Sequence, residues 1–300
     1  MRKDHALILI PLCILQFFSG LGGIDIYWHD EAQNAGCAVE MLENKELIVP
    51  TFNCELRPHK PPLHYYFMMA GYKIFGVGPL GARFFSGLMG FLTVMLIYFS
   101  TARIADPNAG LFAAASLGLA LHFPLHMKQA VPDPYLIFFT TAAILGIFAG
   151  RKLHRPLFAY GGYVSLGLAM LAKGPIAAVI TASAFLILFV INGKGSWKEI
   201  KAYRPFSGAA LTVAVAAPWY ILVDRATQGA YTEGFFVTHN FGRFASTMDG
   251  NGGIFLISWG FILIGLLPAT VYLFQSLQYG WQARKRSDAA ALAYSAFIAV

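Results

Sequence analysis

Charged residues are scarce in this sequence. Asp, Glu, Lys and Arg make up 12% of the 300 residues, whereas soluble domains carry about 25%. Hydrophobic residues, in contrast, reach 57%. So few charges cannot cover the surface of a soluble protein, and we therefore predict that lipid forms part of the solvent around this chain.

Acidic residues are fewer than basic ones, at 15 against 22, which gives a net charge of +7. An excess of positive charge is also found in proteins that bind nucleic acid. Here the basic residues stand in short clusters between apolar stretches, and this placement is more typical of a membrane topology signal. We therefore expect no nucleic acid partner.

Cysteine is rare as well. The three cysteines show no CxxC or similar Cys/His spacing, which argues against a zinc-finger type of scaffold. Cys13 lies in an apolar stretch and is expected to pack there. Cys37 and Cys54 share one loop, and we treat a disulfide between them as a hypothesis that requires an oxidising compartment.

Long apolar runs dominate the rest of the sequence. A spanning helix needs about 20 mostly apolar residues, and about nine such segments are expected. The first is read as an uncleaved span, because no convincing signal-peptide cleavage pattern follows it. The last is cut short, so we expect further spans in a longer protein. The expected spans are roughly 6–24, 79–102, 107–127, 134–150, 157–172, 175–192, 206–223, 254–275 and 288–300.

The loops between these spans alternate in charge. By the positive-inside rule, the basic set is cytoplasmic and the first span runs outward. The other set, on the outer side, holds 11 of the 15 acidic residues. We therefore expect an all-α integral membrane protein, with residues 1–300 as one domain and the N-terminus in the cytoplasm. The basic set holds 13 of the 22 Lys and Arg residues, namely Arg2, Lys3, Arg103, Arg151, Lys152, Arg155, Lys194, Lys198, Lys201, Arg204, Arg284, Lys285 and Arg286.

Two outer loops are long, covering about 25–78 and 224–253, and long ordered loops are often functional. Within the first loop, apolar residues recur at three- and four-residue spacing over 30–42, which predicts a short helix. A second amphipathic helix is predicted over 62–75, where a proline pair sets the first turn. Both are expected to lie in the outer membrane interface.

The first loop carries two groups that could perform chemistry. Asp30 and Glu31 stand at the start of its first helix, where they act either as a cap with a first-turn acid or as a general base or charge stabiliser. Lys60 follows His59 and precedes a rigid proline pair. Lys60 is either a side chain that snorkels to the headgroups or a clamp for a lipid phosphate.

Three further groups follow along the chain. Asp133, between two prolines, is a helix cap or a second acid of the site. Lys173, in a tight outer turn, is a headgroup anchor or a ligand of an anionic acceptor. His239 and Arg243 lie in the second long loop. Arg243 either binds two phosphate oxygens at once, as arginine can, or forms a salt bridge to an outer acid. Together these groups suit chemistry on a lipid-linked phosphate without naming the group transferred.

The order of the motifs resembles the polyprenyl-phosphate-dependent glycosyltransferases of the GT-C fold, and most closely the bacterial aminoarabinose transferase and protein mannosyltransferase superfamily. The resemblance covers about residues 8–275. Its motifs are Asp30-Glu31-Ala32, Met41-Leu42, Ile48-Val49-Pro50, Lys60-Pro61-Pro62-Leu63, Tyr72-Lys73-Ile74-Phe75-Gly76, Ala82-Arg83, Asp133, Ala172-Lys173-Gly174-Pro175 and Asn240 to Phe244.

The resemblance implies an inverting sugar transfer from a polyprenyl phosphate donor at the outer face of a bacterial inner membrane. The acceptor would be a lipid such as lipid A, a glycan or a protein. Asp30 would match the catalytic aspartate and Asp133 a second acid, while Lys60 and Arg243 would match ligands of the donor phosphate. The acceptor or secondary site would involve Glu31, His59, Lys173 and His239.

The sequence departs from the family pattern at two points. Relatives often carry an acid before Lys-Pro-Pro, where this chain has His59. Some relatives use that acid to bind a metal, so the sequence leaves open whether this chain binds a divalent metal. Gln33 and Asn34 stand where relatives often carry aromatic and basic residues, which leaves the sugar undefined.

Two other classes of protein compete with this interpretation. A transporter of an anionic or lipid-linked substrate would place its ionisable residues near the membrane midplane and show repeat symmetry. Here the charges gather in outer loops and no repeat is visible. A non-catalytic scaffold leaves the matched placement of Asp30, Lys60 and Asp133 unexplained.

Overall fold

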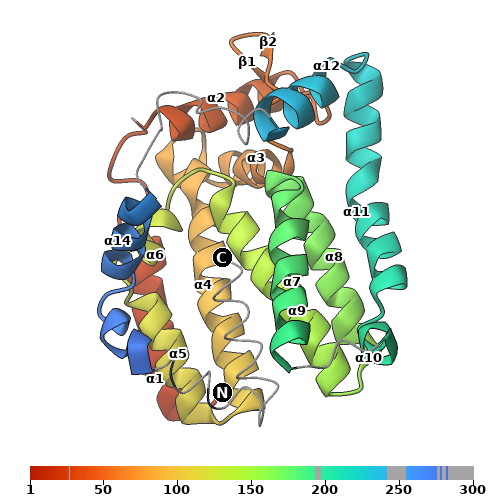
Figure 1. Ribbon diagram of the computed structural model, residues 1–300. Helices are drawn as coiled ribbons and strands as arrows, with labels where there is room; N and C mark the ends of the chain where they lie inside the picture. Colours follow the sequence, from red (N-terminus) through yellow and green to blue (C-terminus); the bar gives the residue numbers. More distant parts are fainter. Residues whose placement is uncertain (27, 193–196, 242–254, 276–277, 279–281, 283–300) are drawn as a thin grey trace.

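The computed structural model describes residues 1–26, 28–192, 197–241, 255–275, 278 and 282. Long helices run side by side to form a bundle, and shorter elements lie across one end of it (Figure 1). The predicted all-α bundle with interfacial helices is confirmed. The helices of the bundle are α1 (Lys3–Phe18), α4 (Pro79–Ile104), α5 (Pro107–Gly118), α6 (His122–His126), α7 (Asp133–Lys152), α8 (Pro156–Lys173), α9 (Ile176–Asn192), α11 (Pro205–Ala226) and α14 (Phe255–Gly265).

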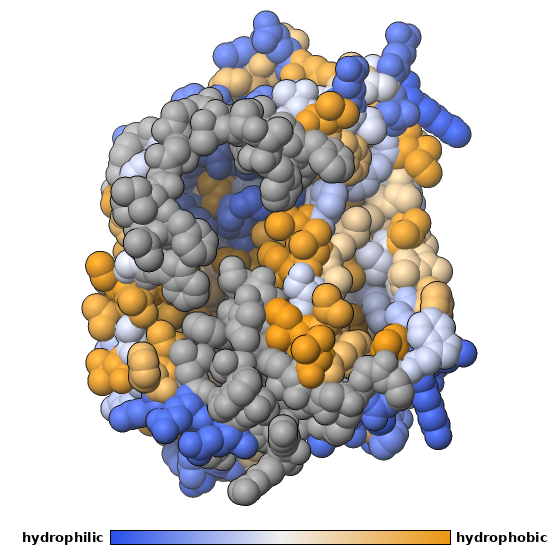
Figure 2. Space-filling view, viewed as in Figure 1, coloured by the Kyte–Doolittle hydropathy of each residue, from blue (hydrophilic) through white to orange (hydrophobic). Residues whose placement is uncertain are grey.

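Within the described part of the chain, three helices are both long and apolar enough to cross a membrane. They are α4, α7 and α11, with 26, 20 and 22 residues. Each carries a proline in its first turn. Proline is tolerated there because backbone N–H groups in the first turn of a helix have no hydrogen-bond partner within the helix. Figure 2 shows hydrophobic residues across the middle of one face and hydrophilic residues at its two ends. The chain is thus a multi-pass membrane protein.

Two expected spans differ from the observed helices. The span expected over 107–127 is interrupted, because α5 ends at Gly118 and α6 begins at His122. Pro124 explains the break, since its ring would clash with the carbonyl four residues earlier in a continuous helix. The span expected over 254–275 contains α14 and then a 3-10 turn, η2 (Ala269–Tyr272). The segment 288–300 lies outside the described residues, so the count of about nine spans stays a prediction.

Small residues let α7 and α8 approach closely. A Cβ atom added to Gly150 would lie 2.5 Å from the Cβ of Ala159, and one added to Gly162 would lie 2.7 Å from the backbone nitrogen of Ile147. Contacts of this kind are a common way for helices to associate in lipid, where no hydrophobic effect drives them together. The α7–α8 pair therefore forms a rigid base, and both helices present an end to the region that holds the predicted site.

The layer across the end of the bundle comes mainly from the first long loop. Both helices predicted there are present, and each lies within one residue of its expected bounds. A short antiparallel hairpin, which the sequence pattern did not predict, joins them. The elements are α2 (His29–Glu43), β1 (Thr51–Phe52), β2 (Glu55–Leu56) and α3 (Leu63–Phe75).

Glu40 holds the hairpin against α2. Its carboxylate accepts hydrogen bonds from Thr51 Oγ1 at 2.8 Å and from the backbone nitrogen of Asn53 at 2.5 Å. The hairpin also needs Gly36, because a Cβ atom there would lie 2.7 Å from the Phe52 ring. The hairpin is therefore fixed on α2 by both a polar and a steric contact.

The second long loop begins with a short helix, α12 (Ala230–Thr232), which continues into a π-helix, η1 (Glu233–Phe241). Gly234 packs on the first loop, since a Cβ atom there would lie 2.6 Å from Pro58 Cγ. The two loops predicted to be functional are therefore in contact.

The hypothesis of a disulfide between Cys37 and Cys54 is wrong for this structure, because both cysteines are free. Cys37 faces inward and packs in one cluster with Met41 and Tyr65, whereas Cys54 is exposed in the hairpin turn. Burial raises the pKa of the Cys37 thiol to about 12, which disfavours the thiolate needed for disulfide exchange.

Candidate active site

Glu31 is a buried anchor at the start of α2. Its two carboxylate oxygens accept hydrogen bonds from Arg83 Nε at 2.7 Å and Arg83 Nη2 at 2.8 Å. The backbone nitrogen of Ala130 donates to the same carboxylate at 2.8 Å. This paired geometry ties α2 to α4 and to the segment before α7. We interpret Glu31 as a residue that positions the site.

Asp30 differs from its neighbour in being exposed. It lies in the first turn of α2, where the helix dipole favours an anion. Because Glu31 is held in place, the backbone that carries Asp30 is fixed while its carboxylate faces outward. Asp30 is therefore the accessible acid of this pair.

Lys60 is half-buried where the two long loops meet. Its carbonyl oxygen accepts a hydrogen bond from Tyr231 Oη at 2.9 Å, although the two residues lie 171 positions apart. Beside it, the rings of His59 and His239 lie 4.0 Å apart between centroids. The structure thus brings together three of the residues predicted for the site, from two separate loops.

Arg57 is a cation close to Lys60 in the sequence, where a side chain that snorkels to the headgroups was one interpretation and no role in the site was assigned. It is only 4% exposed, and its guanidinium donates to Gln33 Oε1 at 2.9 Å, Asn34 Oδ1 at 3.5 Å and Tyr65 Oη at 3.4 Å. Among the described contacts its partners are neutral, so the positive charge is not cancelled locally. The amides at positions 33 and 34 are the sequence signal, since they depart from the family pattern at this point.

His64 is a fully buried histidine in the first turn of α3. Burial, followed by the charges of Lys60 and Arg57, holds the pKa of His64 well below its ordinary value, while a backbone hydrogen bond at Pro61 and the charge of Asp133 act in the opposite direction. The imidazole of His64 is therefore neutral at pH 7.

Asp133 and Lys173 form an ion pair, with 2.6 Å between Oδ1 and Nζ. His126 Nε2 lies 3.8 Å from the same oxygen. The pair joins the first residue of α7 to the last residue of α8, at the end of the bundle that α2 and α3 cover (Figure 1). The sequence predicted both residues for the site but did not predict that they pair.

Comparison with known proteins places this arrangement in a family. Residues 59–221 match the family described as dolichyl-phosphate-mannose-protein mannosyltransferase. The chain belongs to this family. A protein of Edwardsiella ictaluri named undecaprenyl phosphate-alpha-4-amino-4-deoxy-L-arabinose arabinosyl transferase is 26% identical over 281 residues, which covers 92% of this chain and 50% of the relative. An uncharacterized protein of Aquifex aeolicus is 30% identical over 248 residues, covering 82% of this chain and 55% of the relative.

Solved structures of the family confirm the GT-C fold. ArnT from Cupriavidus metallidurans, crystallised with undecaprenyl phosphate, superposes with a TM-score of 0.88 at 19% identity, over 100% of this chain and 55% of ArnT. The S. cerevisiae protein O-mannosyltransferase Pmt1-Pmt2 complex bound to the sugar donor gives 0.57 at 19% identity, over 76% of this chain and 34% of the yeast chain. The chain spans about half the length of the curated relatives it matches.

Two points of the family pattern remain, namely the prediction for Arg243 and the divalent metal that the sequence left open. Arg243, expected to bind the donor phosphate, lies outside the described residues. Among the residues that the structure does describe, no three His, Cys, Asp or Glu side chains are grouped in a way that could hold a metal ion.

Proposed function

We propose that this family member transfers a sugar from a polyprenyl phosphate to an acceptor at the outer face of a bacterial inner membrane. The acceptor is a lipid such as lipid A, a glycan or a protein. Family membership supports the reaction class. The observation that supports the location of the site most directly is the Tyr231–Lys60 hydrogen bond, because it joins the two outer loops at the cation expected to bind phosphate.

The chemistry follows from the charges near this contact. The bond between the anomeric carbon and the phosphate oxygen breaks, and the electron pair leaves with the phosphate. Lys60 and the buried Arg57 stabilise the negative charge that develops there. Arg243 is the third cation in this proposal.

Asp30 acts on the acceptor side. The acceptor oxygen attacks the anomeric carbon from the face opposite the phosphate, which inverts the configuration. If the acceptor is a hydroxyl, its proton passes to Asp30 as general base. If it is a phosphate, it is already ionised, and Asp30 only orients it or stabilises charge on the sugar. The pH dependence of the transfer rate separates these two acceptors.

Asp133 is proposed to serve as the second acid, and its ion pair with Lys173 supports this role by holding the carboxylate in place. Figure 2 shows hydrophilic atoms in a hollow at this end of the molecule. His59, His239 and Lys173 are proposed to line the acceptor side, whereas Glu31 contributes by fixing α2.

The experiment uses purified full-length protein, labelled polyprenyl-phosphate sugars and candidate acceptors. We expect Lys60→Ala to raise the KM for the donor by at least tenfold, while Lys73→Ala, an exposed cation at the end of α3, leaves KM unchanged. Transfer in proteoliposomes should require the donor on the side that carries the first loop. Ion-gradient-driven uptake without transfer would instead indicate a transporter.

A further inference from the structure

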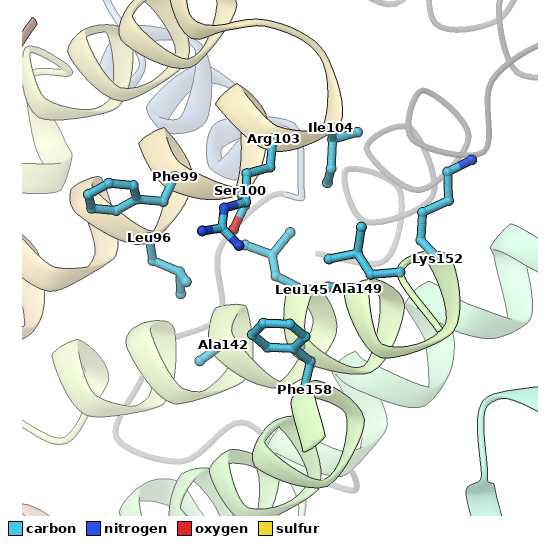
Figure 3. A pocket seen from close by; sticks show the side chains of 12 residues that line it. Leu96, Phe99, Ser100, Arg103, Ile104, Ala142, Leu145, Ala149, Lys152 and Phe158 are labelled. Carbon is cyan, nitrogen blue, oxygen red and sulfur yellow. The ribbon is translucent and has the colours of Figure 1, made fainter. Parts of the chain in front are cut away.

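A cavity of about 460 Å³ lies between α4, α7 and α8. Its walls are mostly apolar, and Figure 3 shows side chains of all three helices facing it. A volume of this size falls in the range of ordinary small-ligand sites, about 300–1,000 Å³. The residues used below are Leu96, Phe99 and Arg103 of α4, Ala142, Leu145 and Lys152 of α7, and Phe158 of α8.

This cavity is far from the proposed transfer site. Asp133 and Lys152 are the first and last residues of α7, which has 20 residues, so they lie about 29 Å apart along its axis at about 1.5 Å per residue. The hydrocarbon core of a bilayer is about 30 Å thick. The two ends of α7 therefore reach opposite membrane surfaces, and the cavity extends from Ala142, in the middle of α7, to the surface opposite the first loop.

The charge at the cavity has one sign. Its described lining includes two cations, Arg103 and Lys152, and no carboxylate. The Arg103 side chain is exposed, and its guanidinium points into the space between α4 and α7, whereas the Lys152 ammonium points away from the cavity (Figure 3). Apolar walls beneath a guanidinium match a ligand with an anionic head and an apolar chain.

We propose that this cavity binds an anionic phospholipid of the membrane leaflet opposite the transfer site. The phosphate lies against Arg103, with Lys152 adding to the local positive potential, and an acyl chain lies along Leu96, Phe99 and Phe158. Basic pockets between membrane helices are known to recognise anionic headgroups in this way. The site is separate from sugar transfer, because its two cations lie at the end of α4 and of α7 opposite the end that carries Asp133.

The test measures lipid retention by the full-length protein with native mass spectrometry, after titration with phosphatidylglycerol or phosphatidylcholine. We expect one phosphatidylglycerol to bind preferentially. Arg103→Gln should weaken its binding by about fivefold, since a basic residue at the membrane surface contributes about 1 kcal/mol. Lys152→Gln should weaken it less, because the Lys152 ammonium points away from the cavity. Ala142→Phe, which fills the cavity without changing a charge, should reduce binding at least as much as Arg103→Gln does.

Two matched variants complete the experiment. Arg155→Gln removes an exposed cation at the same end of the bundle that does not line the cavity, and it should bind phosphatidylglycerol as the wild type does. Lys60→Ala should also bind normally, whatever its effect on transfer. Equal retention of the two lipids would overturn the proposal. So would unchanged binding in Ala142→Phe, which would indicate attraction to the surface or a cavity filled by another part of the full-length chain.

Discussion

The Lys173 ammonium lies 2.6 Å from Asp133 Oδ1, which joins the last residue of α8 to the first residue of α7. Both side chains are partly shielded, with exposures of 31% and 25%. An ion pair at the joined ends of two packed helices fixes the floor of the proposed site. The pair also keeps the Asp133 carboxylate ionised and in one orientation.

This pair should be worth more than an exposed salt bridge. We expect Lys173→Met to lower the free energy of unfolding by about 1–2 kcal/mol, because a shielded carboxylate then loses its cation at 2.6 Å and keeps the more distant His126 at 3.8 Å. Chemical unfolding of Lys173→Met, Asp133→Asn and the double variant measures the coupling, and Lys73→Met serves as the exposed control. Strictly additive effects of the two changes would show that the pair contributes nothing.

The adjacent acids Asp30 and Glu31 should behave in opposite ways. Arg83→Met leaves the buried Glu31 carboxylate without its cation and should cost about 3–5 kcal/mol of unfolding free energy. Asp30→Asn alters an exposed side chain and should change stability by at most about 0.5 kcal/mol. Thermal unfolding of both variants checks this contrast, and comparable losses would mean that the two acids are wrongly assigned.

Tyr231 should affect the donor without affecting the fold. Tyr231→Phe removes the hydrogen bond that holds the Lys60 carbonyl, which should raise the KM for a polyprenyl-phosphate donor up to about tenfold with little change in kcat. Tyr220→Phe is the matched control, because its hydroxyl donates to the Met170 carbonyl at 3.1 Å and not to Lys60. If Tyr231→Phe and Tyr220→Phe had the same KM for the donor, the positioning role of Tyr231 would be refuted.

His64 should make stability depend on pH. Its pKa is depressed in the folded protein, so between that pKa and about 6.5 the unfolded chain binds a proton that the folded protein does not. Stability is therefore fully present above about pH 6.5 and falls by about 1.4 kcal/mol for each pH unit below it. Chemical unfolding from pH 7 to pH 5 should show this slope reduced in His64→Leu but kept in His122→Gln, which removes an exposed histidine.

Much of the fold could be predicted from local sequence rules. The helices α2 and α3 follow directly from apolar spacing and from a proline pair at the first turn, and α4, α7 and α8 follow from apolar length. The break between α5 and α6 was missed because Pro124 lies within an apolar run that hides it. The π-helix η1 and the hairpin were missed because each depends on contacts with the rest of the fold.

The site could be predicted only in part. Asp30 and Lys60 were identified from residue chemistry and motif order, and the first loop, which carries both, meets the second loop at Lys60. The Glu31–Arg83 pair joins residues 52 positions apart, and no periodicity encodes such a contact. Arg57 was assigned no role in the site for a related reason, since its burial depends on how the hairpin packs against α2.

The rate of sugar transfer by Asp30→Asn tests the central claim most directly. Full-length protein in proteoliposomes is supplied with a labelled polyprenyl-phosphate sugar and its acceptor, and Glu43→Gln, an exposed acid at the other end of α2, is the control. The account predicts a fall in kcat of at least about 100-fold for Asp30→Asn with a hydroxyl acceptor, an unchanged unfolding temperature and a control that works as the wild type does. Transfer by Asp30→Asn at the wild-type rate would contradict it.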